Sequence, residues 1–527
     1  MSPILFVVAM IPLTEMLRRE SVKGYSFGED GKKINHLLFM DDLKIFSSSK
    51  EKLEELVKVV HKFSKDIGME FGWKKCAALT IEAGERVECE DIELPDGGRI
   101  KDVEEGGYKY LGVLEEAGIM AAEMKEKVRK EYLRRVKLVA GSKLSGGNLI
   151  KAVNVWAVSV VRYTAGILDW TEIEMDAMDV KTRKILTMNG AFHAKSSVDR
   201  LYMKRNVGGR GLIGVRFCIE SEVRGLKEYV EGSEEWMLKA AAESLNFGFK
   251  VKETKKEYVA KVVQDRKDRL WTEKEKTHGK FWKTVGDVGG SERTWQWLRG
   301  GHLRKGIEGY ICAAQERVLN TRQYRVDTLK IPGNKMCRLC HNFPENVEHL
   351  TAGCGKLAQV EYRRRHDKMG LRVYWELLGK YGFKRKDRWW EESVVRGEVR
   401  RSEDGKVEIW WDRPVNTTQQ LDHNKSDVVV IDWGKKDCLI VEFCVPFDGN
   451  VATREGGKVD RYVPLSLEMA RMYKLRVKVV SVVVGALGTV TKDIEEAMTA
   501  MGIPDVVGGL QTTAVVATAA ILRKVLT

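Results

Sequence analysis

The sequence predicts an α+β protein of several domains, and three observations lead to this prediction. The chain has 527 residues, a length at which roughly three or four domains are usual. Hydrophobic residues make up 43% of it and charged residues 31%, which is typical of soluble globular proteins and excludes a collagen-like or wholly disordered chain. Short strand-like runs occur towards both ends, whereas residues 117–186 show helical spacing.

The charge balance indicates a polyanionic partner. There are 90 Lys and Arg against 76 Asp and Glu, a formal net charge of +14 at pH 7. Such an excess attracts nucleic acid, which is therefore the first candidate partner. No run reaches the ~18–20 apolar residues of a membrane-spanning helix, so we expect no membrane contact. Nine cysteines, an odd number in a long chain, argue against a disulfide framework and for a reducing compartment with clustered cysteines binding metal.

The chain opens inside an apolar, helix-like run, as expected of a truncated reading frame. Two strand-like runs, residues 37–40 and 43–46, are separated by Asp41-Asp42 and predict a tight hairpin. Adjacent carboxylates at such a tip can hold the paired Mg²⁺ ions of a nucleotide polymerase, about 3.5–4 Å apart. Asp-Asp is also ordinary turn chemistry, so the pair alone leaves both interpretations open.

A helix and further short strands follow the hairpin. A serine N-cap signal and apolar residues at three- and four-residue spacing predict an amphipathic helix that ends at Gly68. A strand over residues 69–79 comes next, and a turn at residues 95–98. Residues 117–186 are helical and basic, and residues 225–300 are charge-rich helix.

Three cysteines and a histidine follow one another as Cys337-x₂-Cys340-x₈-His349-x₄-Cys354. Thiolates and an imidazole at such spacing can close a tetrahedron around Zn²⁺. His341 is a competing ligand, although its place beside Cys340 makes simultaneous binding awkward. Because protein fills all four positions, we expect a structural zinc site; the alternative is four unrelated residues in a loop.

A basic segment follows this cluster. Residues 361–388 carry ten Lys and Arg against four acids, interleaved with aromatic side chains. This mixture suits phosphate contacts combined with base stacking. A solvated helix face with extended lysine side chains would have the same composition.

A second pair of carboxylates lies in a predicted α/β unit. Strand-like residues 428–447, the helix 454–473 and the strand 477–484 form this unit. If its first turn centres between Gly434 and Lys435, Asp427 and Glu442 are directly opposed, with Cβ atoms about 4.5–5.5 Å apart. Their like charges then argue for a shared cation. A register shift of one residue would separate them, and two surface acids on a hairpin are the alternative.

Taken together and in order, these motifs resemble the open reading frames of site-specific non-LTR retrotransposons with a restriction-like endonuclease. Four segments resemble a reverse transcriptase palm. The tail of its nucleotide-pocket motif resembles Ser2-Pro3-Ile4-Leu5-Phe6, and its aromatic-x-Asp-Asp box resembles Phe39-Met40-Asp41-Asp42. Its lysine-bearing motif resembles Gly68 with Lys75-Cys76, and its primer grip resembles Tyr108-Lys109-Tyr110-Leu111-Gly112.

The resemblance assigns roles in this palm. Asp41 would bind Mg²⁺ with Asp42 as its supporting neighbour, and Lys75 would lie near the incoming triphosphate. Tyr110-Leu111-Gly112 would lie under the primer. The strand that carries the first metal-binding Asp of such palms would precede residue 1, so we expect no polymerase activity from this chain alone. Downstream, Arg200, Arg205 and Arg210 belong to a glycine-rich segment of the same reading frames, and we expect them to face nucleic acid.

The C-terminal third resembles the knuckle and endonuclease of these elements. Its basic run is expected to bind nucleic acid through Arg363, Arg364, Arg365 and His366. Residues 423–488 resemble the endonuclease, with Ser426 in place of the usual proline before Asp427. Asp427 and Glu442 would bind Mg²⁺, Lys458 would orient or deprotonate the attacking water, and Tyr462 would support the scissile phosphate, with Arg461 as a second basic candidate.

The resemblance also implies domains, partners and a reaction. The expected parts are a partial palm at 1–115, a helical thumb at 116–225, a helical linker at 226–330, a zinc knuckle with its basic segment at 331–390, and a restriction-like endonuclease at 400–527. Nicked target DNA would prime reverse transcription of an RNA template, which implies a nuclear protein if it acts on chromosomal DNA and a cytoplasmic one otherwise. The alternatives are a decayed, non-catalytic nucleic-acid-binding protein and an adaptor that binds partners through helices 120–320.

Overall fold

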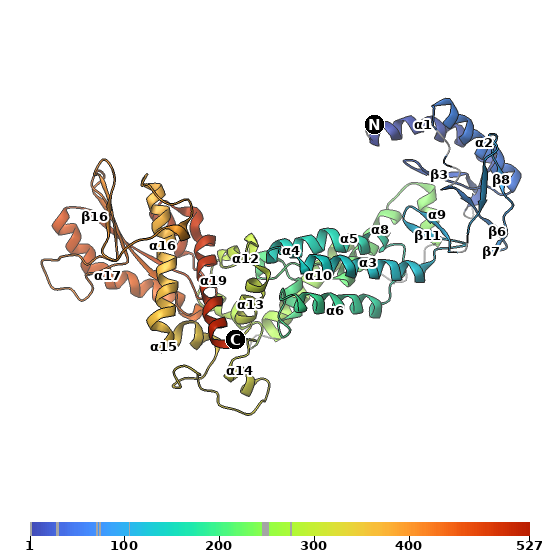
Figure 1. Cartoon of the computed structure of the whole chain (residues 1–527). Coiled ribbons are helices and arrows are strands. Elements are labelled where there is room, and N and C mark those ends of the chain that lie inside the picture. Colours follow the sequence, from blue (N-terminus) through green and yellow to red (C-terminus); the bar gives the residue numbers. More distant parts are fainter. Residues whose placement is uncertain are drawn as a thin grey trace. The chain divides into compact units, whose positions relative to one another are not determined.

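The computed structural model describes residues 3–27, 31–69, 72, 75–104, 106–244, 252–273 and 277–527 (Figure 1). Ser2, four residues of the predicted strand 69–79, and residues 245–251 and 274–276 of the predicted linker lie outside the described residues. The protein is an α+β, multidomain chain whose contacts divide it into two compact units. Unit 1 is Met1–Tyr132, Val160–Glu174 and Cys218–Lys255; unit 2 is Leu133–Ser159, Met175–Phe217 and Lys256–Thr527.

Unit 1 combines helices with short, mostly paired strands. Its elements are α1 (Pro3–Arg19), η1 (Ser21–Lys23), β1 (Tyr25–Phe27), β2 (Lys32–Ile34), β3 (His36–Phe39), β4 (Asp42–Ile45), α2 (Lys50–Asp66), β5 (Ala77–Ala78), β6 (Thr80–Glu82), β7 (Glu85–Val87), β8 (Ile92–Glu93), β9 (Arg99–Asp102), β10 (Tyr108–Tyr110), β11 (Val113–Glu115) and α9 (Trp236–Ser244). Five helices have residues in both units: α3 (Ala121–Gly141), α5 (Val158–Thr164), α6 (Glu172–Met188), α8 (Val215–Glu231) and α10 (Lys255–Asp268), whose first residue belongs to unit 1.

The predicted amphipathic helix is α2. Its N-cap is Ser49, whose hydroxyl accepts a hydrogen bond from the amide of Lys52. The buried face, which includes Leu56, Val60 and Phe63, packs with α1 in one core. This confirms the helix, and the reason is its period: apolar residues at three- and four-residue spacing form one stripe.

Two local predictions differ from the structure. The hairpin β3–β4 is present, but Phe39 pairs with Asp42, so the turn residues are Met40 and Asp41, with Met40 at φ 56°. The predicted strand over residues 69–79 is reduced, among its described residues, to the two-residue strand β5. Apolar residues in this stretch favour a strand locally. Among the described residues, however, β5 pairs with β9 alone, so no second neighbour extends the strand.

The helical part of unit 2 precedes its sheet. Its elements are α4 (Gly146–Ala152), η3 (Val153–Ala157), α7 (Val198–Tyr202), η4 (Arg205–Val207), α10 (Lys255–Asp268), η5 (Arg269–Glu273), α11 (Lys280–Asp287), η6 (Glu292–Trp295), α12 (Gln296–Gly300), α13 (Lys305–Gln315), α14 (Arg322–Asp327), η7 (His349–Gly353), α15 (Gly355–Leu357), η8 (Ala358–Tyr362), α16 (Arg363–Lys380) and η9 (Trp389–Glu391).

The arginines of the glycine-rich segment do not face solvent, contrary to prediction. Arg200 and Arg210 are each 1% exposed. Glu308, on α13, accepts ion pairs of 2.7 Å from both Arg205 and Arg210, and Arg200 lies 3.7 Å from Glu316. Buried charges need such partners, and these lie about a hundred residues away in sequence, beyond the reach of local patterns.

Removing the shared carboxylate should therefore destabilise unit 2. Burial opposes ionisation of Glu308, but Arg210 and Arg205 hold its pKa below the usual range. We expect Glu308→Gln to lower the free energy of unfolding by about 3–5 kcal/mol, because it leaves buried guanidinium groups without a counter-charge. Urea denaturation measures this change. Glu495→Gln, which removes an exposed ion pair with Arg293, is the matched control and should cost less than about 1 kcal/mol; equal effects would contradict the argument.

The C-terminal part of unit 2 is a three-layer arrangement around a five-stranded sheet (Figure 1). Its strands β12 to β16 follow chain order across the sheet, and β15 and β16 are the parallel neighbours. The elements are β12 (Val399–Arg401), β13 (Val407–Trp411), β14 (Val428–Asp432), β15 (Asp437–Cys444), η10 (Asp448–Asn450), α17 (Val451–Tyr473), β16 (Arg476–Val483), α18 (Asp493–Ala500), η11 (Pro504–Val506) and α19 (Val507–Leu526).

Successive side chains along β14 pack on opposite faces of this sheet. Val428 and Val430 pack with α16, α18 and α19, whereas Val429 and Ile431 pack with α17. Residues 363–380, predicted to belong with the knuckle, thus form α16 and cover the sheet as a layer of the same core. The period of two in β14 is the physical cause, because successive side chains point to opposite faces.

Helix α19 completes two cores. By length and composition, residues 504–526 could cross a membrane, and 61% of the apolar window is buried inside the unit. The helix contacts α12, α13 and α16, and its side chains belong to the core around the sheet and to the core beside the cysteine cluster. Its apolar composition is that of a core helix.

One buried acid on α17 predicts a pH effect. Glu455 is 6% exposed and accepts a 2.7 Å hydrogen bond from Thr491; burial raises its pKa to about 7. Between pH ~4.5 and ~7 the folded state therefore binds more protons than the unfolded chain, so this group's contribution to stability falls as pH rises. We expect Glu455→Gln to be more stable than the parent by about 1–3 kcal/mol at pH 8, but not at pH 4.5. Urea denaturation at both pH values decides, and a pH-independent difference would contradict it.

Candidate functional site

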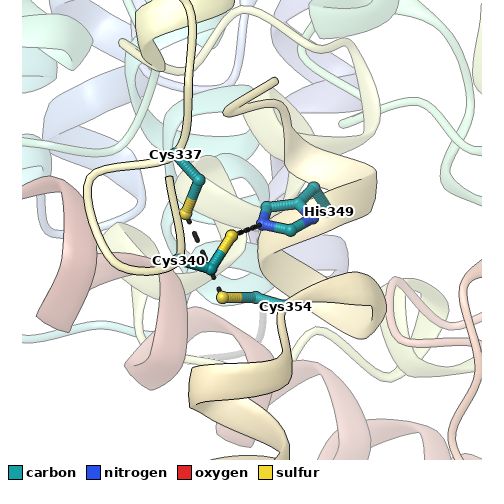
Figure 2. A group of neighbouring side chains, drawn as sticks. All are labelled: Cys337, Cys340, His349 and Cys354. Carbon is teal, nitrogen blue, oxygen red and sulfur yellow. Dashed lines mark hydrogen bonds between the residues drawn. The ribbon is translucent and has the colours of Figure 1, made fainter. Parts of the chain in front are cut away.

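The four residues of the cysteine–histidine motif meet in space (Figure 2). All their ligand atoms lie within 4.8 Å of one another. Cys337 Sγ lies 4.0 Å from Cys354 Sγ, and Cys340 Sγ lies 3.3 Å from His349 Nε2. Sulfur and nitrogen atoms at the corners of a zinc tetrahedron are about 3.5–3.8 Å apart. The residues therefore fit Zn²⁺, and His341 is outside the cluster.

The surrounding chain holds these ligands in place. Cys337 and Cys354 are buried in a core shared with α13 and α19. Glu345, fully buried, accepts two hydrogen bonds of 2.8 Å from the Arg338 guanidinium. The Tyr362 hydroxyl lies 3.0 Å from the His349 carbonyl and accepts from the Cys354 amide at 3.2 Å. These contacts orient the ligands, as the outer shell of a metal site does.

Asp427 and Glu442 are brought together as the hairpin register predicts. Val428 pairs with Val441, which places the two acids opposite each other: Asp427 directly precedes β14, and Glu442 lies within β15. The Asp427 amide donates to Glu442 Oε1 at 3.0 Å, and the Phe443 amide donates to Asp427 Oδ2 at 2.8 Å. Two carboxylates fixed in this way suit Mg²⁺, which usually binds one or two carboxylates and completes its shell with water and phosphate oxygens.

Helix α17 adds a cation and a hydroxyl to this pair. Lys458 Nζ lies 2.7 Å from Glu442 Oε2, and the Tyr462 hydroxyl donates to the Lys425 carbonyl at 3.0 Å. The two side chains are one helical turn apart and therefore share a face of α17. Lys458 is thus adjacent to the carboxylates, while Tyr462 points to the chain segment that precedes Asp427.

His366 is a member of this site whose contact the sequence does not reveal. Its Nε2 lies 3.3 Å from Asp427 Oδ2, and its Nδ1 lies 3.2 Å from Asp367 Oδ1. Burial disfavours its charge, but the hydrogen bonds to Asp367 and Asp427 raise the pKa of His366 to about 9. The basic run of the sequence includes His366, but sixty-one residues separate it from Asp427, so no local pattern joins them.

The two carboxyl groups have different electrostatic environments. Burial favours a higher pKa for Asp427, but His366, the Phe443 amide and Lys458 together hold that pKa below the usual value. Burial, followed by the charge of Asp427, raises the pKa of Glu442 to about 7. Divergent environments for paired acids are typical of functional sites, although structural ion pairs can also produce them.

A cavity of about 920 Å³ opens onto this cluster. Its lining includes Asp427, Lys458 and His349 of the cysteine cluster. Arg363 and Arg396 also line it. A hollow that joins acids to arginines can hold a phosphate group beside a cation, which is what phosphodiester chemistry requires.

The basic run itself divides into two kinds of side chain. Arg363 and Arg364 are exposed on α16, as expected for phosphate contacts. Arg365 differs from the prediction: it is 2% exposed and donates to Thr518 Oγ1 at 2.9 Å and to the Val445 carbonyl at 3.0 Å. Its side chain fastens α16 to α19 and to the loop after β15, and does not reach solvent.

The acids of unit 1 are exposed at the β3–β4 tip. Asp41 is in the turn and Asp42 is the first residue of β4. Burial, followed by the charge of Asp42, raises the pKa of Tyr110, whose ring lies 5.2 Å from Lys44 Nζ. Among the described residues, no third metal-ligating group gathers with these acids.

The other two predicted elements of unit 1 lie near one another. The Tyr108 hydroxyl donates to the Lys75 carbonyl at 3.1 Å. Leu111 and Gly112 form the tight β10–β11 turn, with φ of 46° and 83°. The carbonyl of Leu111 accepts a hydrogen bond from the Tyr163 hydroxyl.

Unit 1 thus contains the β3–β4 hairpin with its two acids, Lys75, and the β10–β11 turn with Gly112. The family model for reverse transcriptase (RNA-dependent DNA polymerase) matches residues 1–114. The matched part includes the β3–β4 hairpin and the β10–β11 turn, so a reverse transcriptase-type region is present in the chain. That family copies nucleic-acid templates, which makes nucleic acid the partner that the match implies. No curated protein matches the chain.

Proposed function

We propose that this chain is part of a retrotransposon reverse transcriptase whose C-terminal region, residues 400–527, is a Mg²⁺-dependent DNA endonuclease. The observation that carries the proposal is that backbone amides hold both carboxylates. The Asp427 amide donates to Glu442 and the Phe443 amide donates to Asp427, with Lys458 2.7 Å from Glu442. Nicked target DNA would supply the 3′ hydroxyl from which a complete polymerase copies an RNA template. The reverse transcriptase match at residues 1–114 supports this setting.

The chain's own residues account for hydrolysis of a phosphodiester. Asp427 and Glu442 would hold Mg²⁺, which supplies charge stabilisation of the phosphate and a more acidic bound water. Lys458 orients the attacking water beside Glu442 Oε2, where the two groups already lie 2.7 Å apart. His366 holds the Asp427 carboxylate in place through Nε2. Water adds to phosphorus, the bond to the 3′ oxygen breaks, and that oxygen leaves as a hydroxyl.

Zn²⁺ and the hairpin acids have other roles in this proposal. Zn²⁺ at Cys337, Cys340, His349 and Cys354 would be structural, since all four ligand positions come from protein. Asp41 and Asp42, with Lys75 and the Tyr110 turn, would belong to a palm that does not polymerise by itself. The exposure of both acids at the turn supports this assignment.

A nicking assay tests the proposal. The full chain should convert supercoiled plasmid to nicked circles with Mg²⁺ and not with EDTA, and Asp427→Ala should abolish the activity. Absence of nicking, together with salt-sensitive DNA binding, would contradict the endonuclease and favour a catalytically decayed nucleic-acid-binding protein. The arginines exposed on α16, Arg363 and Arg364, are the observation that favours this alternative.

A further inference from the structure

Two further cavities extend from the one beside Asp427. A second cavity, of about 520 Å³, shares Arg363, Asp367, Arg396 and Trp411 with the first. A third, of about 600 Å³, shares Lys368 with the second and is lined by Trp389 and Trp390. Lining residues shared along α16 connect the three hollows, which run from Asp427 to a pair of tryptophans.

The connecting wall is basic along one face of α16. Arg364, Lys368 and Arg372 recur at four-residue spacing, so they share a helix face. The first and last are eight residues apart, or about 12 Å along the helix axis. Phosphates recur at about 3.4 Å per strand along a duplex and are spaced more widely in an extended single strand, so this length can meet about two or three phosphates of an unpaired strand. Arg364 lies 3.6 Å from Glu361 and Arg372 lies 3.5 Å from Glu376, whereas Lys368, whose charge acts on Glu361, forms no ion pair within 4 Å among the described residues.

The far end of the path offers an aromatic surface. Trp390 is 60% exposed, more than any other tryptophan in the described residues. Its ring lies 5.9 Å from that of Trp389 at an interplanar angle of 87°. The Arg388 guanidinium lies over this ring, 5.6 Å from its centroid. Burial of a tryptophan ring is favourable, so the exposed remainder of the ring suits a partner with a flat apolar face. Nucleic-acid bases have such a face, and their phosphates complement the wall.

We propose that this path binds one unpaired DNA strand, with its phosphates along Arg364 and Lys368 and a base stacked on Trp390. Bases inside a duplex stack on each other, so only an unpaired base can present its face to this ring. The inference rests on the proposed endonuclease and refines its substrate class: the DNA beside the cut is single-stranded, as in an opened or frayed target.

Binding without cleavage tests the path. The probe is a fluorescein-labelled dT₂₀ strand, compared with a labelled duplex of the same length, and anisotropy is measured on the full chain in EDTA. We expect Trp390→Ala to weaken dT₂₀ binding roughly 5- to 150-fold and to change duplex binding less than about twofold. Trp390→Phe, which retains a ring, should recover most of the affinity.

Matched controls come from the opposite end of the sheet. Trp433 and Lys406 adjoin the strand ends where Val407 pairs with Asp432, away from the end with Trp411. Lys368→Glu should weaken dT₂₀ binding and make the salt slope shallower by about 0.7. Trp433→Ala and Lys406→Glu should leave both unchanged. Equal loss of dT₂₀ and duplex binding in Trp390→Ala, or no loss of either, would overturn the path.

The binding readout is separate from the nuclease proposal. EDTA prevents cleavage, so dT₂₀ binding that depends on Trp390 supports the path even if no plasmid is nicked. Conversely, plasmid nicking accompanied by dT₂₀ binding that is insensitive to Trp390→Ala retains the endonuclease and refutes the single-strand path.

Discussion

Cys354→Ser will release zinc and unfold the segment around the cysteine cluster. The hydroxyl of serine is a poor ligand, and the remaining three groups cannot complete the tetrahedron. Structural zinc contributes about 10–16 kcal/mol of apparent binding free energy in zinc-finger peptides near pH 7, and that energy is available to folding. Cys354 also belongs to the core of α13 and α19, so the loss should reach the rest of unit 2. Elemental analysis of the purified chain and urea denaturation measure the two effects.

His341→Asn is the control for this experiment. His341 lies beside Cys340 in sequence but outside the ligand cluster, and its φ of 59° is one that asparagine tolerates. Zinc content should stay near one per chain in His341→Asn and fall towards zero in Cys354→Ser. Loss of zinc from the control, or its retention in Cys354→Ser, would refute the assignment of ligands.

The sequence predicted the elements whose determinants are local. The register of Asp427 and Glu442 follows from the two strands and the short turn between them, and the structure has that register. The cysteine spacing likewise brings four ligands together, because a short segment can fold around one metal. The amphipathic period of residues 50–66 was enough to predict α2.

What the sequence did not predict depends on distant partners. Arg365 carries the same charge as Arg363 and Arg364, yet it is buried because Thr518 and Val445 accept its hydrogen bonds. Arg210 is buried because Glu308 neutralises it. A local pattern of basic residues cannot distinguish a phosphate contact from an internal ion pair, since the choice is made by residues brought close only by folding.

Glu442→Gln should reduce Mg²⁺-dependent nicking roughly 10²- to 10⁴-fold. Gln has nearly the same shape, and its amide oxygen can still accept the 3.0 Å hydrogen bond from the Asp427 amide. The substitution removes the negative charge that would hold Mg²⁺ and that lies 2.7 Å from Lys458. The fold of the hairpin should therefore persist while the cation is lost.

The control for this substitution is on the same strand. Asp437, at the exposed start of β15, pairs with Arg476 at 2.8 Å and lies at the opposite end from Glu442. Asp437→Asn makes the same chemical change without touching the cavity, so its nicking rate should match the parent. Thermal melting of both variants separates loss of fold from loss of function. If Glu442→Gln melts like the parent and still nicks DNA at the parental rate, the carboxylate pair is not the metal site, and the geometry at β14 and β15 serves only to hold the sheet.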